Sequence, residues 1–161
     1  MNAIDLLESQ HREVEDLFAR IEKAANNETK EQAFIELADS LAIHTSIEEH
    51  HFYPAVKESE TEEILIESVE EHLEIKRKLS ALLEIDGADE TFDAKLEALR
   101  DDVERHVEEE EEDLVPKVMT LFDEDQLESI GQAMSAEQAE LEEKGNPRDA
   151  VPSETENPAP I

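Results

Sequence analysis

Two segments of the chain place a histidine, a glutamate and a proline at the same spacing. The segment HTSIEEHHFYP begins at His44 and the segment HVEEEEEDLVP begins at His106. In each segment a glutamate follows four positions after the histidine (Glu48 and Glu110), and a proline follows ten positions after it. Residues four apart share one face of an α-helix, so each segment can present an imidazole and a carboxylate side by side. Without a thiolate, these ligands suit iron, manganese or zinc.

Two further histidines extend this pattern into an internal repeat. His11 precedes His44 by 33 positions, and His72 precedes His106 by 34 positions. The sequence QHREVEDLF around the first resembles EHLEIKRKL around the second. Two helical hairpins related by a pseudo-twofold axis would each deliver two histidines and one glutamate to a shared centre. Chance does not readily give matched spacings and a repeated proline together.

The elements that carry these residues are predicted to be helices. Apolar residues recur at spacings of three and four, and glycine is scarce. The predicted fold class is all-α: an up-down-up-down four-helix bundle with a short fifth helix that Asp123 caps. The bundle is expected over residues 1–144, with a helix bent or ended near Pro54. The remainder, residues 145–161, is rich in proline and acidic residues and is expected to be disordered.

The histidines fall within the apolar stripes of these predicted helices, one on each. Two glutamates at the same level of a bundle interior would be costly to ionise without a partner. A non-metal explanation, in which the histidines are hydrogen-bonded core residues, must account for the buried glutamates as well. A bound cation accounts for both. The predicted metal ligands are His11, His44, Glu48, His72, His106 and Glu110.

Composition restricts the partners further. The chain has 46 acidic and 14 basic residues, a formal net charge of −32, and no cysteine. Nucleic acid and anionic membranes are therefore not expected partners, and disulfides and thiolate sites are excluded. The N-terminal MNAIDLLESQ lacks the basic and apolar regions of a secretory signal, so a soluble cytoplasmic protein is expected. A high-salt environment and binding of weakly held cations would each account for the acidity.

The repeated histidine–glutamate pattern, with an acidic residue after each glutamate and a proline downstream, resembles the hemerythrin-like HHE cation-binding family. The resemblance covers about residues 1–125. It implies a non-haem di-iron centre, with manganese or zinc as alternatives. His11 and His44 would then bind one iron, and His72 and His106 the other. The two glutamates of the repeat would bridge the irons.

One position departs from the oxygen-carrying members of that family. Those proteins have a further histidine one turn after the histidine of the third helix, where this chain has Lys76, and the corresponding position in the first helix is Glu15. The centre could have six protein ligands, or Glu15 could add a ligand while Lys76 balances charge or gates the metals. Either arrangement disfavours reversible oxygen carriage, and favours reaction with peroxide or nitric oxide or a response to iron.

Three residues near the first motif are assigned lesser roles. His51 lies one turn beyond Glu48, and we expect it to be a surface or supporting residue rather than a ligand. His50 is expected to be exposed. Tyr53 is expected to pack at the helix end, with a hydrogen bond near the site as the alternative reading.

The expected function is a di-iron protein that binds O2, H2O2 or NO in oxidative or nitrosative stress or in iron homeostasis. The first alternative is an enzyme on the same site that decomposes hydrogen peroxide. The second is a non-catalytic iron sensor or buffer, and the third is a metal-free acidic bundle that acts through its surface. Ferritin-type oxidation is disfavoured because those sites use Glu-x-x-His, whereas both pairs here have histidine first and a spacing of four.

Overall fold

A computed structural model describes residues 1–161, and its regular elements are all helices. This confirms the predicted all-α class. The α-helices are α1 (Ala3–Lys23), α2 (Asn27–Ile47), α3 (Tyr53–Ala55), α4 (Glu62–Leu83), α5 (Phe92–Glu109), α6 (Val115–Leu121) and α7 (Glu124–Lys144). None of these helices has the length and apolar character needed to cross a membrane.

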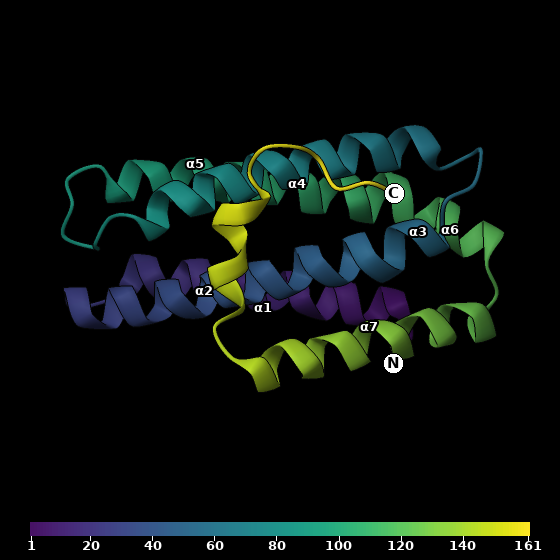
Figure 1. The fold of residues 1–161 in the computed structure, drawn as a ribbon, viewed down its shortest axis with the longest axis horizontal. Coiled ribbons are helices and arrows are strands. Elements are labelled where there is room, and N and C mark those ends of the chain that lie inside the picture. Colours follow the sequence, from purple (N-terminus) through teal and green to yellow (C-terminus); the bar gives the residue numbers. More distant parts are fainter.

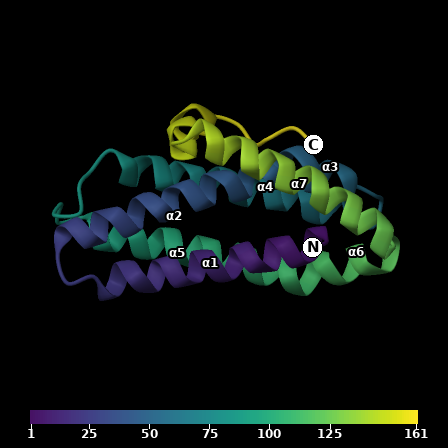
Figure 2. The same ribbon diagram turned by 90° about the horizontal axis from the view of Figure 1, so that it is seen from below.

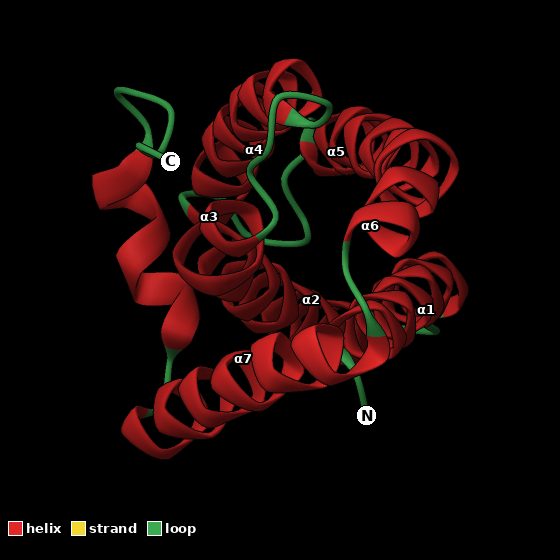
Figure 3. Ribbon diagram, turned by 90° about the vertical axis from the view of Figure 1, so that its right-hand side faces the viewer, coloured by secondary structure: helices red, strands yellow, loops and turns green.

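The long helices α1, α2, α4 and α5 lie side by side and run in alternating directions around a common interior (Figures 1 and 3). Helix α7 crosses the outside of this group and packs on α1 and α2 (Figure 2). Asp123 caps α7 as predicted: its side chain accepts from the backbone N–H of Gln126, and the Gln126 side chain accepts from the backbone N–H of Asp123. The prediction that this fifth helix would be short is wrong, since α7 has 21 residues, the same length as α1.

The apolar interior is divided into two clusters. One cluster includes Leu41, Ile75 and Val103, and the other includes Ile47 and Leu114. Along each long helix, the histidines of the predicted site fall between the residues of the first cluster and those of the second. A polar layer therefore separates two apolar layers, which shield it from water at both ends.

Two π-helical segments interrupt the helices at the polar layer. They span Glu48–Phe52 and Glu110–Leu114, so each begins at the glutamate of a sequence repeat. Each ends in a backbone N–H that donates to the carbonyl of that glutamate, five residues earlier. Prolines then occupy the first turns of α3 and α6. Such π turns are rare and are frequently found at functional sites. The sequence pattern had predicted only a bend or an end near Pro54.

The C-terminal residues do not form the disordered tail predicted from composition. Pro147–Glu154 is a 3₁₀ helix that packs on α2 and α4, and it crosses their outer face in Figure 1. Val151 within it is only 2% exposed and joins the first apolar cluster. The Arg148 side chain also pairs with Asp39 on α2 at 3.0 Å. A few specific contacts of this kind anchor the segment, and the overall composition of a segment does not reveal them.

Candidate metal centre

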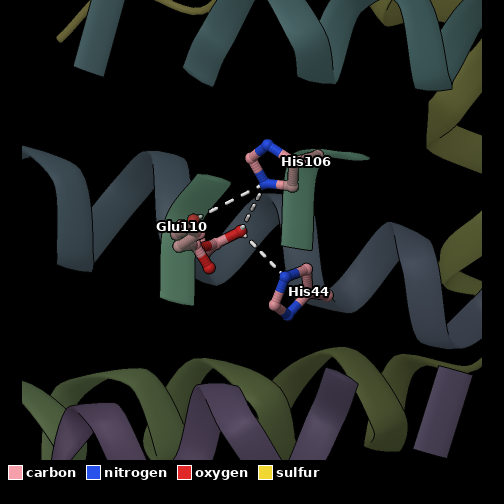
Figure 4. A group of neighbouring side chains, drawn as sticks. His44, His106 and Glu110 are labelled. Carbon is pink, nitrogen blue, oxygen red and sulfur yellow. Dashed lines mark ion pairs between the residues drawn. The ribbon is translucent and has the colours of Figure 1, made fainter. Parts of the chain in front are cut away.

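The six predicted ligands converge in the polar layer, and all are between 0 and 5% exposed. The histidines come from the four long helices, one from each, and the glutamates are the first residues of the two π segments. Figure 4 shows His44, His106 and Glu110 pointing toward one another. Candidate ligand atoms of these three residues and Glu48 all lie within 4.8 Å of one another.

Glu48 contacts one histidine from each half of the chain. Its Oε1 atom lies 2.9 Å from Nε2 of His44 and 3.1 Å from Nε2 of His72. Because His44 belongs to the first repeat and His72 to the second, this oxygen lies between the two pairs of histidines.

Glu110 contacts the remaining two histidines, one with each of its carboxylate oxygens. Its Oε1 atom lies 3.1 Å from Nε2 of His11, and its Oε2 atom lies 3.5 Å from Nε2 of His106. The Nε2 atoms of His72 and His106 are themselves 3.1 Å apart. Two ligands at right angles on one metal, each with a metal–nitrogen distance of about 2.1 Å, would be about 3 Å apart. The observed separation therefore suits two imidazoles that share an ion.

The outer nitrogen of every histidine lies against a side-chain oxygen. The Nδ1 partners are Glu111 for His11 (2.8 Å), Gln10 for His44 (2.7 Å), Glu49 for His72 (2.7 Å) and Glu71 for His106 (2.9 Å). An acceptor at Nδ1 places the ring proton there, so the Nε2 lone pair is directed to the centre, as in metal-binding histidines.

Sequence reasoning missed these four acceptors, although the repeat contains them. Gln10 and Glu71 immediately precede the first histidine of each repeat, and Glu49 and Glu111 immediately follow its glutamate. The π turn explains how both Glu48 and Glu49 can be buried although they are adjacent in the chain. Their matching positions in the two repeats were the available sequence signal for these acceptors. Only the fold shows which helix each of them faces.

Several polar atoms of the centre have no hydrogen-bond partner. The buried, unpartnered atoms among the ligands are His11 Nε2, His44 Nε2, Glu48 Oε2 and Glu110 Oε1. An unsatisfied buried polar atom is costly, and four of them around one point indicate a missing positive partner. This donor set of imidazoles and carboxylates fits iron, manganese or zinc.

The pKa shifts of these residues also indicate that the buried carboxylates need a positive partner. Burial acts to raise the pKa of Glu48, but the charge of His44 and hydrogen bonds from other histidines outweigh it, so the pKa lies well below its usual value. Burial acts to lower the pKa of His106, but hydrogen bonds to Glu48 and Glu71 raise it well above 6.5. The pKa values of His11, His72 and His106 are all raised, so without a metal the carboxylates favour protons on these three imidazoles.

Lys76, which departs from the pattern of the oxygen carriers, and Glu15, its counterpart in the first helix, have different surroundings. Lys76 is buried, and its Nζ atom lies 2.8 Å from Oε1 of Glu49 and 3.5 Å from Oε1 of Glu154. Glu49 in turn accepts from His72, so Lys76 is connected to a candidate ligand through one intermediate residue. The Glu15 side chain is 63% exposed and pairs with Arg12 at 3.5 Å, so the structure does not bring Glu15 into the centre.

Tyr53 contributes more to the centre than the helix-end packing that was expected. It is fully buried in the second apolar cluster, and its hydroxyl donates to Oε2 of Glu110 at 2.8 Å. The hydroxyl also lies 3.2 Å from Nε2 of His72. Burial, followed by the nearby charge of Glu110, raises the Tyr53 pKa well above 10, so the hydroxyl keeps its proton at neutral pH.

The other two histidines face away from the centre. His50 is exposed, as predicted, and its Nδ1 atom lies 2.6 Å from Oε1 of Glu137 on α7. His51 is half-buried, and its Nε2 atom lies 3.5 Å from Oε2 of the same glutamate. The two histidines therefore connect the first π segment to α7.

Comparison with known proteins agrees with this geometry. The chain is 28% identical to an uncharacterised protein of Mycobacterium tuberculosis over 149 residues. The aligned region covers 91% of this chain and 90% of that protein. It is 24% identical over 144 residues to a DNA nickase of Nostoc sp., covering 89% of this chain but 41% of the nickase. A crystal structure of a hemerythrin HHE cation-binding domain-containing protein from Mycobacterium kansasii superposes with a TM-score of 0.78, at 27% identity and 89% coverage of both chains. The hemerythrin HHE cation-binding domain profile matches residues 2–118. The chain belongs to the hemerythrin HHE cation-binding domain family.

Proposed function

We propose that this protein binds two iron ions and reacts with hydrogen peroxide, dioxygen or nitric oxide. In this proposal His11 and His44 hold one ion, His72 and His106 hold the other, and Glu48 and Glu110 are shared. The physiological context would be oxidative or nitrosative stress, or iron homeostasis.

The observation that carries the proposal is the orientation of the four imidazoles. Every Nδ1 lies against a side-chain acceptor and every Nε2 faces the centre, where each glutamate contacts one histidine of each half. A set of hydrogen-bonded core histidines would not need this uniform arrangement. Two shared carboxylates between two histidine pairs support two ions rather than one.

Iron held there would supply the electron exchange that reaction with an oxygen species requires. The chain's own residues set the conditions for it. The two apolar clusters exclude water on either side, and the four Nδ1 acceptors fix the imidazole orientations. Tyr53 keeps a proton on its hydroxyl within hydrogen-bond distance of Glu110. Lys76 neutralises Glu49, so the carboxylate that orients His72 adds no net charge.

Decomposition of hydrogen peroxide is the second candidate function. Lys76 stands where the oxygen carriers have a further histidine, and its amine is engaged by Glu49 instead of the centre. The centre therefore has fewer protein ligands and more open positions. Together with the Tyr53 hydroxyl, this arrangement favours turnover of a small oxygen species over its reversible storage.

The test is the metal content of untagged protein, measured by elemental mass spectrometry before and after anaerobic iron loading. We expect two irons per chain, and a visible spectrum that changes on exposure to air, peroxide or nitric oxide. His44→Ala and His106→Ala should each lose iron. His50→Ala, which removes an exposed histidine two residues from Glu48, is the matched control and should keep it.

The outcomes separate the candidates. Sustained oxygen evolution from peroxide without loss of iron would establish the enzyme. A stoichiometric reaction without turnover would support ligand binding. A large change in helix content on iron removal, without reactivity, would favour a sensor or buffer. Failure to hold stoichiometric metal after anaerobic loading would overturn the metal proposal altogether.

A further inference from the structure

A cleft on the surface of the bundle adjoins the candidate metal centre at His11. It lies between α1 and α5, has a volume of about 330 Å³, and includes His11 in its lining. Its apolar wall consists of Val14, Phe18, Val103 and Val107. The other lining residues are charged, so the cleft has an apolar wall and a charged rim.

A second, much smaller cavity lies inside the bundle. Its volume is about 10 Å³, roughly the space that one water-sized molecule needs. All four histidines of the centre line it, together with apolar residues that include Leu41 and Ile75. A molecule in this cavity would lie against the imidazoles of both halves.

The outer cleft and the inner cavity share part of their walls. His11, Val14, Val103 and Val107 line both. Three of these four residues are buried, whereas Val107 is half-buried and packs against the first apolar cluster from outside. Val107 is therefore the wall residue that can move or be changed in size with the least disturbance to the core.

The rim of the cleft is strongly acidic. Glu15, Glu104, Glu108 and Glu112 are exposed around it, and Arg12 is its single basic residue. The charge of Arg12 is already offset, because its guanidinium lies 2.6 Å from Glu111 and 3.5 Å from Glu15. An approaching anion would be repelled by this rim, whereas a neutral molecule would not.

We propose that the cleft between α1 and α5 is the passage to the metal centre, with Val107 as its gate, and that it admits small neutral molecules while its acidic rim slows the entry of anions. This inference rests on the proposed function and restricts the set of small molecules that can reach the centre. Hydrogen peroxide, dioxygen and nitric oxide meet the requirement. Superoxide, nitrite and azide carry a negative charge and do not.

The gate is tested with a size series at position 107 in iron-loaded protein. Val107→Phe should slow the reaction of both hydrogen peroxide and azide by about tenfold or more, with iron content and starting spectrum unchanged. Val107→Ala should react at least as fast as the wild type. Ile85→Phe makes the same kind of enlargement at a half-buried position far from the cleft and should leave the rates unaltered. Wild-type rates in Val107→Phe would overturn the passage.

The charge filter is tested separately with Glu104→Gln/Glu108→Gln/Glu112→Gln. At low ionic strength this variant should react with azide several-fold faster and with hydrogen peroxide at the wild-type rate. The control Glu128→Gln/Glu140→Gln/Glu143→Gln removes the same charge from exposed positions on α7. An equal effect of the control on azide, or an equal increase for peroxide, would overturn the filter.

A third measurement does not depend on iron. In protein prepared without iron, dissolved oxygen serves as a neutral paramagnetic probe of methyl groups in nuclear magnetic resonance. The methyls of Leu41 and Ile75 should relax more strongly than those of Leu65 and Leu114, which are equally buried in the other cluster. Val107→Phe should abolish the difference. If the protein binds no iron but this difference is present, the proposed function fails while the passage stands. Uniform relaxation would overturn the passage.

Discussion

At the scale of single residues, Tyr53 joins the metal centre to the apolar layer behind it. Its ring packs in the second cluster while its hydroxyl donates to Glu110. No tyrosine occupies the equivalent position of the second repeat, where Val115 precedes the proline. The two halves of the centre therefore differ, and the hydroxyl lies on the side of His72 and His106.

Tyr53→Phe should leave the iron content unchanged but alter the visible spectrum and the rate of the peroxide reaction. Loss of the donor to a buried carboxylate should also lower the free energy of unfolding of metal-free protein by about 1–3 kcal/mol. Chemical denaturation and stopped-flow spectroscopy measure these effects. Phe52→Leu, a packing change next to Tyr53 in the same cluster, is the control and should reduce stability without changing the spectrum. An unchanged spectrum in Tyr53→Phe would refute the role of the hydroxyl.

The shifted pKa values of the cluster predict opposite responses of metal-free and metal-loaded protein to pH. The pKa values of His11, His72 and His106 are raised in the folded protein, so their contribution to stability is complete below about 6.5 and is lost as pH rises further. The pKa values of Glu48 and Glu49 are lowered, so their contribution is complete above about 4.5 and is lost as pH falls.

Metal-free protein should therefore gain most from this cluster between about pH 4.5 and 6.5. Metal must displace the imidazole protons, so the stabilisation by metal should grow as pH rises toward 8. Denaturation of both forms across this range measures the effect. Repulsion among surface carboxylates is common to both forms and cancels in the difference between them. Parallel curves for the two forms would contradict the assignment of these protons.

At the scale of the elements, α7 and the C-terminal 3₁₀ helix cover parts of the bundle surface. Helix α7 approaches the start of α1 closely at Gly131. A Cβ atom at this position would lie 2.8 Å from backbone atoms of Met1, Asn2 and Ala3. The glycine is needed because the neighbour is backbone, which cannot rotate away as a side chain can.

Gly131→Ala should lower the free energy of unfolding by about 1–2 kcal/mol, because overpacking against backbone exceeds the gain of about 1 kcal/mol in helix propensity. Thermal and chemical denaturation measure the change. Gly87→Ala is the control, since its added Cβ would meet only the flexible side chains of Glu31 and Asn27. A stabilised Gly131→Ala protein would mean that α7 does not pack so closely on α1.

The C-terminal segment should contribute to stability through Val151. Val151→Ala removes two buried methyl groups from the first cluster, and we expect a loss of about 1–2 kcal/mol in the free energy of unfolding. Ala150→Gly, at the exposed neighbouring position, is the control for a change in the segment outside the core. If Val151→Ala has no effect on unfolding, the segment does not pack on α2 and α4 as described.

At the scale of the whole molecule, the net charge of −32 dominates the long-range electrostatics. Many of the basic residues already lie in ion pairs, such as those of Arg20 with Glu36 and Lys30 with Asp93. The remaining carboxylates repel one another more strongly in the compact fold than in the unfolded chain. Added salt shortens the range of this repulsion, so it should favour the folded state.

Raising KCl from low concentration to 1 M should therefore increase the midpoint of thermal unfolding. The increase should be smaller in Glu128→Gln/Glu140→Gln/Glu143→Gln, which begins with less repulsion. Scanning calorimetry of both proteins over the same salt series measures the effect. A midpoint that does not respond to salt would show that local pairs, rather than the net charge, control stability.

The sequence by itself determined the features that depend on local periodicity. Helical spacing of apolar residues predicted the all-α class, and the positions of His11, His44, His72 and His106 in those stripes predicted that they would meet. These inferences were reliable because residues three or four apart must share a helix face, whatever the rest of the chain does. The repeat also predicted that Glu48 and Glu110 would join these histidines, because each follows a histidine by four positions.

Only the tertiary structure decided the features that depend on contacts between distant segments. Glu111 orients His11 from a position 100 residues away, and the Tyr53 hydroxyl reaches Glu110 across the bundle. The burial of Lys76 against Glu49, the exposure of Glu15 and the ordered Val151 are likewise set by neighbours on other helices. Local periodicity contains no information on which helix faces which. It therefore could predict which histidines and glutamates meet in the bundle interior, but not the residues that orient them.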